Sequence, residues 1–96
     1  MIPTNLQTQE LLNIYHQNDV AMIGVFGSFA RGEESEQSDI DLLVRFAKRK
    51  SLLALVKLER ELSIALGKKV DLLTEAAISP YLRDHILDEL QIVYEA

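Results

Sequence analysis

The chain has 96 residues, of which 48% are hydrophobic and 26% are charged, and its formal net charge is −5. These values predict a single globular domain over residues 1–96, because domains rarely fall much below about 50 residues and disordered chains are less hydrophobic. The absence of cysteine excludes disulfides and cysteine-based zinc sites. The acidic balance argues against a protein that binds long nucleic acid, which requires a basic surface.

No segment of the sequence is expected to enter a membrane. The longest uncharged run, residues 20–30, is much shorter than the roughly 20 apolar residues that a membrane helix requires. The N-terminus also lacks a basic segment followed by an apolar one, which is the pattern of a secretory signal. A cytoplasmic location is therefore the default expectation.

The N-terminal third predicts a helix followed by a strand. Thr4 and Gln7 form a capping-box pattern, and apolar residues follow at helical spacing, so we expect a helix over about residues 4–17. Residues 20–26 are continuously apolar and rich in strand-forming types, as in a strand covered on both faces. Gly27 ends this strand, and a short helical turn is expected directly after it.

The middle of the chain predicts a strand and a long helix. After a wholly polar loop, residues 39–46 return to strand character. Ser51 is placed to cap a helix that ends at Leu66, because Gly67 follows it as a C-terminal stop. We expect one row of leucines to face the core, namely Leu52, Leu55, Leu58, Leu62 and Leu66.

The remaining residues predict a third strand at 70–74, a helix from Pro80 to about Leu90 and an additional short strand at 91–94. The expected order of helices and strands corresponds to an α/β (α+β) fold in which helices flank a small mixed β-sheet.

Acidic residues mark two of the predicted strands. Asp39 and Asp41 are two positions apart, so on a strand their side chains point to the same face. Asp71 lies in the third strand between two apolar residues. If these strands are neighbours, the three carboxylates converge and can hold two divalent cations, for which Mg²⁺ is the natural choice. The alternative is that they are ordinary surface acids.

The predicted turn after the first strand suits a phosphate. Gly27 allows the backbone to approach a ligand closely, and the Ser28 hydroxyl and the turn's N–H groups can bind phosphate oxygens. Arg31 can reach a phosphate or the acceptor, or it can be a solvated turn residue. Carboxylates on one side and a phosphate-binding turn on the other predict a site for a metal-bound nucleoside triphosphate.

The glycine–serine pair, the Asp-x-Asp motif that follows after residues 29–38 and the later acid together resemble the polymerase-beta-like nucleotidyltransferase superfamily. The strings around both motifs, residues 27–33 and 38–44, are similar to its minimal members, the MNT-type antitoxins paired with HEPN ribonuclease toxins. The likeness covers about residues 20–75 in motifs and almost the whole chain in element order. Larger members carry an additional helical domain that holds the acceptor, and this chain has no room for one.

The resemblance implies a function and a role for each site residue. Asp39 and Asp41 would hold the metal on the triphosphate of ATP, with Asp41 bridging to a second ion. Asp71 would ligate the catalytic metal and help to deprotonate the attacking hydroxyl. The implied acceptor is a tyrosine of the toxin, which receives AMP and is silenced. Two alternatives stay open: an antitoxin that acts by binding alone, and a nucleotidyltransferase for small molecules such as aminoglycosides.

Overall fold

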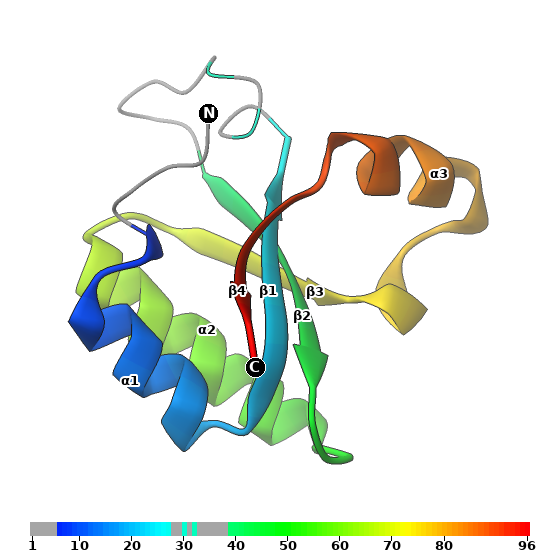
Figure 1. Cartoon of the computed structure of the whole chain (residues 1–96). Coiled ribbons are helices and arrows are strands. Elements are labelled where there is room, and N and C mark those ends of the chain that lie inside the picture. The colour runs from blue at the N-terminus through cyan, green and yellow to red at the C-terminus, as the bar shows by residue number, and fades with distance from the viewer. Residues whose placement is uncertain (1–5, 28–29, 31, 33–38) are drawn as a thin grey trace.

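A computed structural model describes residues 6–27, 30, 32 and 39–96 of the chain, in which helices flank one sheet (Figure 1). The elements, in chain order, are α1 (Gln9–Gln17), β1 (Val20–Phe26), β2 (Ile40–Phe46), α2 (Leu52–Leu66), β3 (Val70–Thr74), the 3-10 turn η2 (Glu75–Ala77), α3 (Pro80–Glu89) and β4 (Gln91–Glu95).

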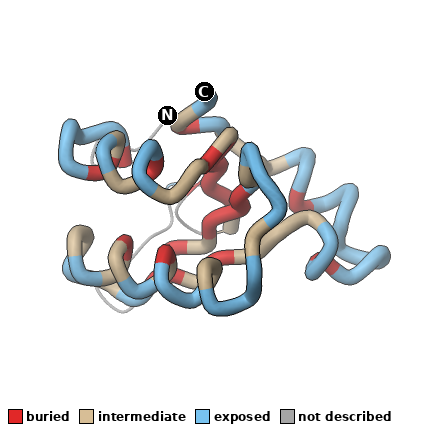
Figure 2. The backbone as a smooth tube through the Cα atoms, turned by 90° about the horizontal axis from the view of Figure 1, so that it is seen from below, coloured by how far each residue is buried: buried red, intermediate tan, exposed pale blue. Residues whose placement is uncertain are grey.

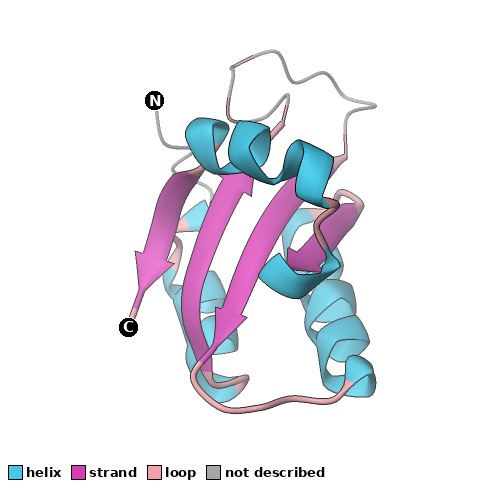
Figure 3. Cartoon of the chain, turned by 90° about the vertical axis from the view of Figure 1, so that its right-hand side faces the viewer, coloured by secondary structure: helices cyan, strands magenta, loops and turns pink. Residues whose placement is uncertain are grey.

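The sheet is mixed, as the sequence predicted, and its strand order is β3-β2-β1-β4. β1 is antiparallel to both β2 and β4, whereas β2 and β3 are parallel. A parallel pair requires a crossover connection, and α2 provides it. Helices α1 and α2 cover one face of the sheet, and α3 with η2 lies on the other (Figure 3).

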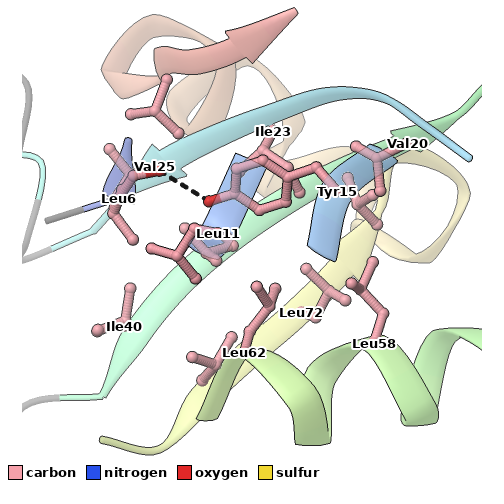
Figure 4. Packing of buried hydrophobic residues seen from close by; sticks show 14 of the residues in the cluster. Leu6, Leu11, Tyr15, Val20, Ile23, Val25, Ile40, Leu58, Leu62 and Leu72 are labelled. Carbon is pink, nitrogen blue, oxygen red and sulfur yellow. Dashed lines mark hydrogen bonds between the residues drawn. The ribbon is translucent and has the colours of Figure 1, made fainter. Parts of the chain in front are cut away.

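The main core lies between the sheet and the α1–α2 layer, where buried residues concentrate on the strands (Figure 2). Within it, the Tyr15 hydroxyl donates a hydrogen bond of 2.9 Å to the carbonyl oxygen of Leu6 (Figure 4). Burial raises the pKa of the Tyr15 hydroxyl above its usual value. A smaller cluster, which includes Phe26, Leu43 and Ile86, joins the other face to α3.

Helix α2 also covers the outer edge of β3. The backbone N–H of Leu72 donates to Glu59 Oε2 at 2.9 Å, and that of Val70 donates to Ser63 Oγ at 3.1 Å. An edge strand otherwise leaves such N–H groups without protein partners. These two bonds fix β3, and therefore Asp71 between them, against the helix that precedes it.

Two expectations about the helices were wrong in detail. α1 begins at Gln9, and its cap is Thr8, whose hydroxyl accepts from Leu11 N at 3.3 Å; Thr4 lies outside the described residues. Leu52 does not face the core: it is 74% exposed, because the first turn of α2 stands at the rim of a hollow lined by Phe46 and Thr74.

The other predicted elements are confirmed. β1 and β3 have the predicted bounds, β2 starts one residue later than expected, and β4 exists as an edge strand. Ser51 and Gly67 cap α2 as expected, and Gly67 adopts a positive φ of 67°. The helical turn expected directly after Gly27 lies outside the described residues. No helix in the described part of the chain is long and apolar enough to cross a membrane.

Candidate active site

The structure brings Asp41 and Asp71 together. Asp41 lies in β2 and Asp71 in β3, and the two are direct partners in the parallel register of these strands. Neighbouring strands are about 4.8 Å apart, so the two half-buried acids start from adjacent backbone positions. Ile40 and Leu42 point into the α1–α2 core. The side chains of Asp41 and Asp71 therefore occupy the opposite face, which α3 partly covers.

Asp39 lies at the same edge of the sheet, one residue before β2. The pairing of the strands continues to this point, because the N–H of Ile40 donates to the carbonyl oxygen of Lys69 at 3.0 Å. The carboxylate of Asp39 lies 3.8 Å from Lys69 Nζ. Among the residues that the structure describes, no three or more His, Cys, Asp or Glu side chains form a ready metal cage. A cation at this edge would therefore need further oxygen ligands besides these carboxylates.

Gly27 ends β1 directly beside Asp41. Phe26 is the antiparallel partner of Asp41, and Gly27 follows it with a φ of +73°. A Cβ at this position would collide with Asp41 Oδ2. Both the backbone conformation and the available space therefore require glycine here. Gly27 therefore lies close to Asp41, whereas its approach to a ligand stays a prediction.

A fourth acid, Glu89, reaches this site and was not predicted. It lies at the end of α3, and its Oε2 accepts a hydrogen bond of 3.1 Å from the N–H of Gly27. Its Oε1 lies 3.2 Å from Nε2 of the exposed His85. Glu89 and Gly27 are 62 residues apart, so no local motif in the sequence could have indicated the contact.

Two predicted nucleotide-binding residues, Ser28 and Arg31, lie outside the described residues. The described part of the site consists of acids on neighbouring strands and a backbone turn of positive φ beside them. Carboxylate oxygens are ligands for hard cations such as Mg²⁺, and a glycine at positive φ lets the backbone approach a ligand closely. The arrangement is suited to chemistry on a metal-bound phosphate.

Comparison with known proteins decides the class. The model of the family described as "Nucleotidyltransferase domain" matches residues 8–93. The chain belongs to this family. It is therefore a nucleotidyltransferase, and the predicted relationship is confirmed.

Two relatives of this nucleotidyltransferase are similar over most of its length. The protein adenylyltransferase MntA of Thermococcus cleftensis is 42% identical over 77% of this chain and 75% of the relative. A Methanocaldococcus jannaschii protein is named as a proposed protein adenylyltransferase. It is 48% identical over 84% of this chain and 87% of its own length.

Solved structures show the same fold. A protein proposed to be a minimal nucleotidyltransferase superposes with a TM-score of 0.73 at 39% identity, covering 83% of this chain and 82% of that one. A chain of a toxin–antitoxin crystal structure with AMP-PNP superposes with a TM-score of 0.76 at 25% identity, covering 91% of this chain and 72% of its own. The predicted fold of a small mixed sheet with flanking helices is thus confirmed.

Proposed function

We propose that this nucleotidyltransferase transfers AMP from ATP to a tyrosine hydroxyl of a partner HEPN-type ribonuclease toxin and thereby acts as its antitoxin. The observation that carries the proposal is the register of Asp41 and Asp71 beside the Gly27 turn. The name of the T. cleftensis relative, a protein adenylyltransferase, supports AMP as the transferred group. The toxin–antitoxin structure with AMP-PNP supports both the partner and the nucleotide.

The site residues divide between nucleotide and metal. Gly27, with the predicted Ser28 and Arg31, would hold the phosphates. Asp39, Asp41 and Asp71 would hold two Mg²⁺ ions, and the donor set fits them because it consists of carboxylate oxygens only. When bound, the ions neutralise the charge that develops on the phosphates and on the leaving group.

The proposed reaction is a direct displacement. The tyrosine oxygen forms a bond to the α-phosphorus of ATP, the bond from that phosphorus to the bridging oxygen breaks, and pyrophosphate leaves. The tyrosine proton passes to a carboxylate oxygen of Asp71. The protein contributes positioning and electrostatic stabilisation, which account for most of the catalysis in phosphoryl transfer.

The charge of the chain agrees with a protein acceptor. A net charge of −5 does not favour long nucleic acid, whereas a toxin with a basic face would be attracted. Because ATP is the proposed donor, we also propose that the reaction takes place in the cytoplasm. The 96 residues would act as one domain without membrane contact.

The proposal is tested by weighing the toxin. The chain is incubated with ATP, Mg²⁺ and the active candidate toxin, and the mass of the toxin is measured. We expect gains of whole AMP units and a parallel loss of ribonuclease activity. A toxin of unchanged mass after incubation with folded, nucleotide-binding protein would overturn the proposal.

One observation favours a second candidate, an antitoxin that acts by binding alone. Helix α3 exposes Tyr81 (96% exposed) and Leu82 (54%), which suits contact with a protein. The variant with Asp39→Asn and Asp41→Asn separates the two candidates. Neutralisation of the toxin that survives these substitutions means that binding is sufficient.

A further inference from the structure

Glu89 joins the end of α3 to the end of β1. Its Oε2 accepts a hydrogen bond of 3.1 Å from the N–H of Gly27, and its side chain is only 16% exposed. A carboxylate that is mostly removed from water is costly unless it accepts hydrogen bonds or is paired. The bond from Gly27, together with His85 Nε2 at 3.2 Å from the other carboxylate oxygen, offsets part of this cost.

The helix that carries Glu89 is itself fixed to the sheet. Ile86, one turn earlier in α3, belongs to the buried cluster that includes Phe26 of β1. The side chain of Leu90 lies where a Cβ of Gly24 would stand, so it packs directly on β1. Figure 3 shows α3 crossing the sheet where β1 ends. Glu89 lies between these two apolar contacts, and its carboxylate therefore reaches the end of β1 from a rigid support.

Gly27 in turn lies against one side of the Asp41 carboxylate. Position 27 has a φ of +73°, and a Cβ there would collide with Asp41 Oδ2. On the other side of Asp41 is Asp71, its register partner in β3. Like charges opposite each other on neighbouring strands repel, so the Asp41 carboxylate is pushed away from Asp71 and toward β1. The backbone of Gly27 limits how far it can move in that direction.

We infer that Glu89 is a positioning residue that acts on Asp41 through Gly27. By holding the N–H of Gly27, Glu89 keeps the glycine backbone against the Asp41 carboxylate and so keeps that carboxylate beside Asp71, where the two can share a cation. The inference deepens the proposed function and rests on it, because it assumes that these two acids bind the metal. Residues that orient a metal ligand from outside typically change metal affinity by roughly 10–100-fold when they are replaced.

Two substitutions of Glu89 separate its hydrogen bond from its charge. Glu89→Gln keeps the length of the side chain and an acceptor oxygen but removes the charge. Glu89→Asp keeps the charge but is one methylene shorter, which withdraws the oxygen from Gly27. If Glu89 acted only by attracting the cation, Glu89→Asp would be the milder change. Because it acts through Gly27, we expect Glu89→Gln to be the milder one.

Calorimetry measures the affinity of each variant for AMP-PNP with and without Mn²⁺, in the absence of any acceptor protein. The ratio of the two affinities isolates the contribution of the cation. We expect Glu89→Asp to lower this ratio about tenfold or more, and Glu89→Gln to leave it within a few-fold of wild type. The matched control Asp88→Ala removes an exposed acid of the same helix and should leave the ratio unchanged.

A ratio for Glu89→Gln that is no higher than the ratio for Glu89→Asp would overturn the inference. A role confined to holding α3 on the sheet would lower the free energy of unfolding in urea without changing either ratio. Wild type covers the case in which a variant does not fold. Its Gly27 amide should stay protected from hydrogen exchange when Mg²⁺ and AMP-PNP bind, whereas loss of that protection would mean that Glu89 releases Gly27 and does not position Asp41.

The same measurements keep this inference separate from the proposed function. If the variants show the expected order but wild type never adds AMP to the toxin, the proposed acceptor is contradicted and the role of Glu89 stands. If wild type modifies the toxin but the variants show the opposite order, the role of Glu89 is contradicted and the proposed function stands. A wild-type affinity for AMP-PNP that does not depend on Mn²⁺ would overturn the metal site and this inference together.

Discussion

Gly27 is under two constraints that substitution can separate. Gly27 and Gly67 both have a positive φ (73° and 67°). Of these two, a Cβ at Gly27 would meet the Asp41 carboxylate, whereas a Cβ at Gly67 would meet nothing within 4 Å. Gly67→Ala should lower the free energy of unfolding by about 1–2 kcal/mol, the cost of a left-handed conformation. Gly27→Ala should cost more and should also reduce AMP transfer. Urea denaturation and a transfer assay check this; equal costs at both positions would contradict the contact with Asp41.

The neighbouring acids Asp41 and Asp71 should lower the stability of the metal-free protein and at the same time be required for AMP transfer. Like charges opposite each other on adjacent strands repel, so without metal Asp71→Asn should raise the free energy of unfolding by up to about 1 kcal/mol. The same substitution should lower AMP transfer by about 100-fold or more, because it removes charge stabilisation of the reacting phosphate. Added Mg²⁺ and ATP should stabilise wild type but not the variant. A variant that is both less stable and fully active would refute this account.

At the scale of elements, α2 controls the position of Asp71 through the edge of β3. Glu59→Ala removes the acceptor of the Leu72 N–H and should lower the free energy of unfolding by about 1–2 kcal/mol. Hydrogen exchange at the Leu72 amide should become faster. The control is Glu61→Ala, which removes only a surface partner 3.9 Å from Lys57. Unchanged exchange at Leu72 in the Glu59 variant would argue against the role of α2.

Helix α1 is attached to the core through Tyr15, and this attachment should be sensitive to alkali. Burial raises the pKa of the Tyr15 hydroxyl in the folded state. The folded protein therefore keeps this proton above pH about 10, where the unfolded chain loses it. Stability is therefore full below that pH and should fall as pH rises above it. Tyr15→Phe should reduce this slope in pH-dependent denaturation, whereas Tyr81→Phe, at an exposed residue, should not. An identical slope in the Tyr15 variant would show that the hydroxyl is not buried in solution.

The order and bounds of most elements could be predicted because local signals determine them. Ser51 and Gly67 cap α2 through bonds and conformations that depend on nearby residues. The start of α1 was misplaced because Thr4 and Thr8 both offer a capping hydroxyl in the sequence, and the long-range bond that Gln7 donates to the carbonyl oxygen of Val93 could not be foreseen. The exposure of Leu52 depends on where the sheet ends, which the period of the helix does not show.

The site was predictable only in part for the same reason. The alternation of β2 indicated that Asp39 and Asp41 share a face, whereas the pairing of Asp41 with Asp71 depends on strand order and register. The hydrogen bonds from Gly27 to Glu89 and from Gln91 to Ala30 join residues that are 62 and 61 positions apart. No sequence period links such distant positions, so only the folded chain reveals them.

The whole molecule has two unequal faces. One side of the sheet is covered by α1 and α2 over a continuous apolar core, and α3 with η2 lies on the other (Figure 3). This arrangement concentrates the proposed chemistry at one end of the sheet, where β1 ends and β2 and β3 begin.

The central claim, that the acids at this edge hold the cation of a bound nucleotide, is tested most directly by paramagnetic relaxation. Mn²⁺ with AMP-PNP is added to the labelled protein, and line broadening is recorded for each residue by NMR. We expect the strongest broadening around Asp41 and Asp71, and its loss in the variant with Asp41→Asn and Asp71→Asn. Broadening centred on other acids, such as Glu75 or Asp88, or unchanged broadening in the variant, would contradict the claim.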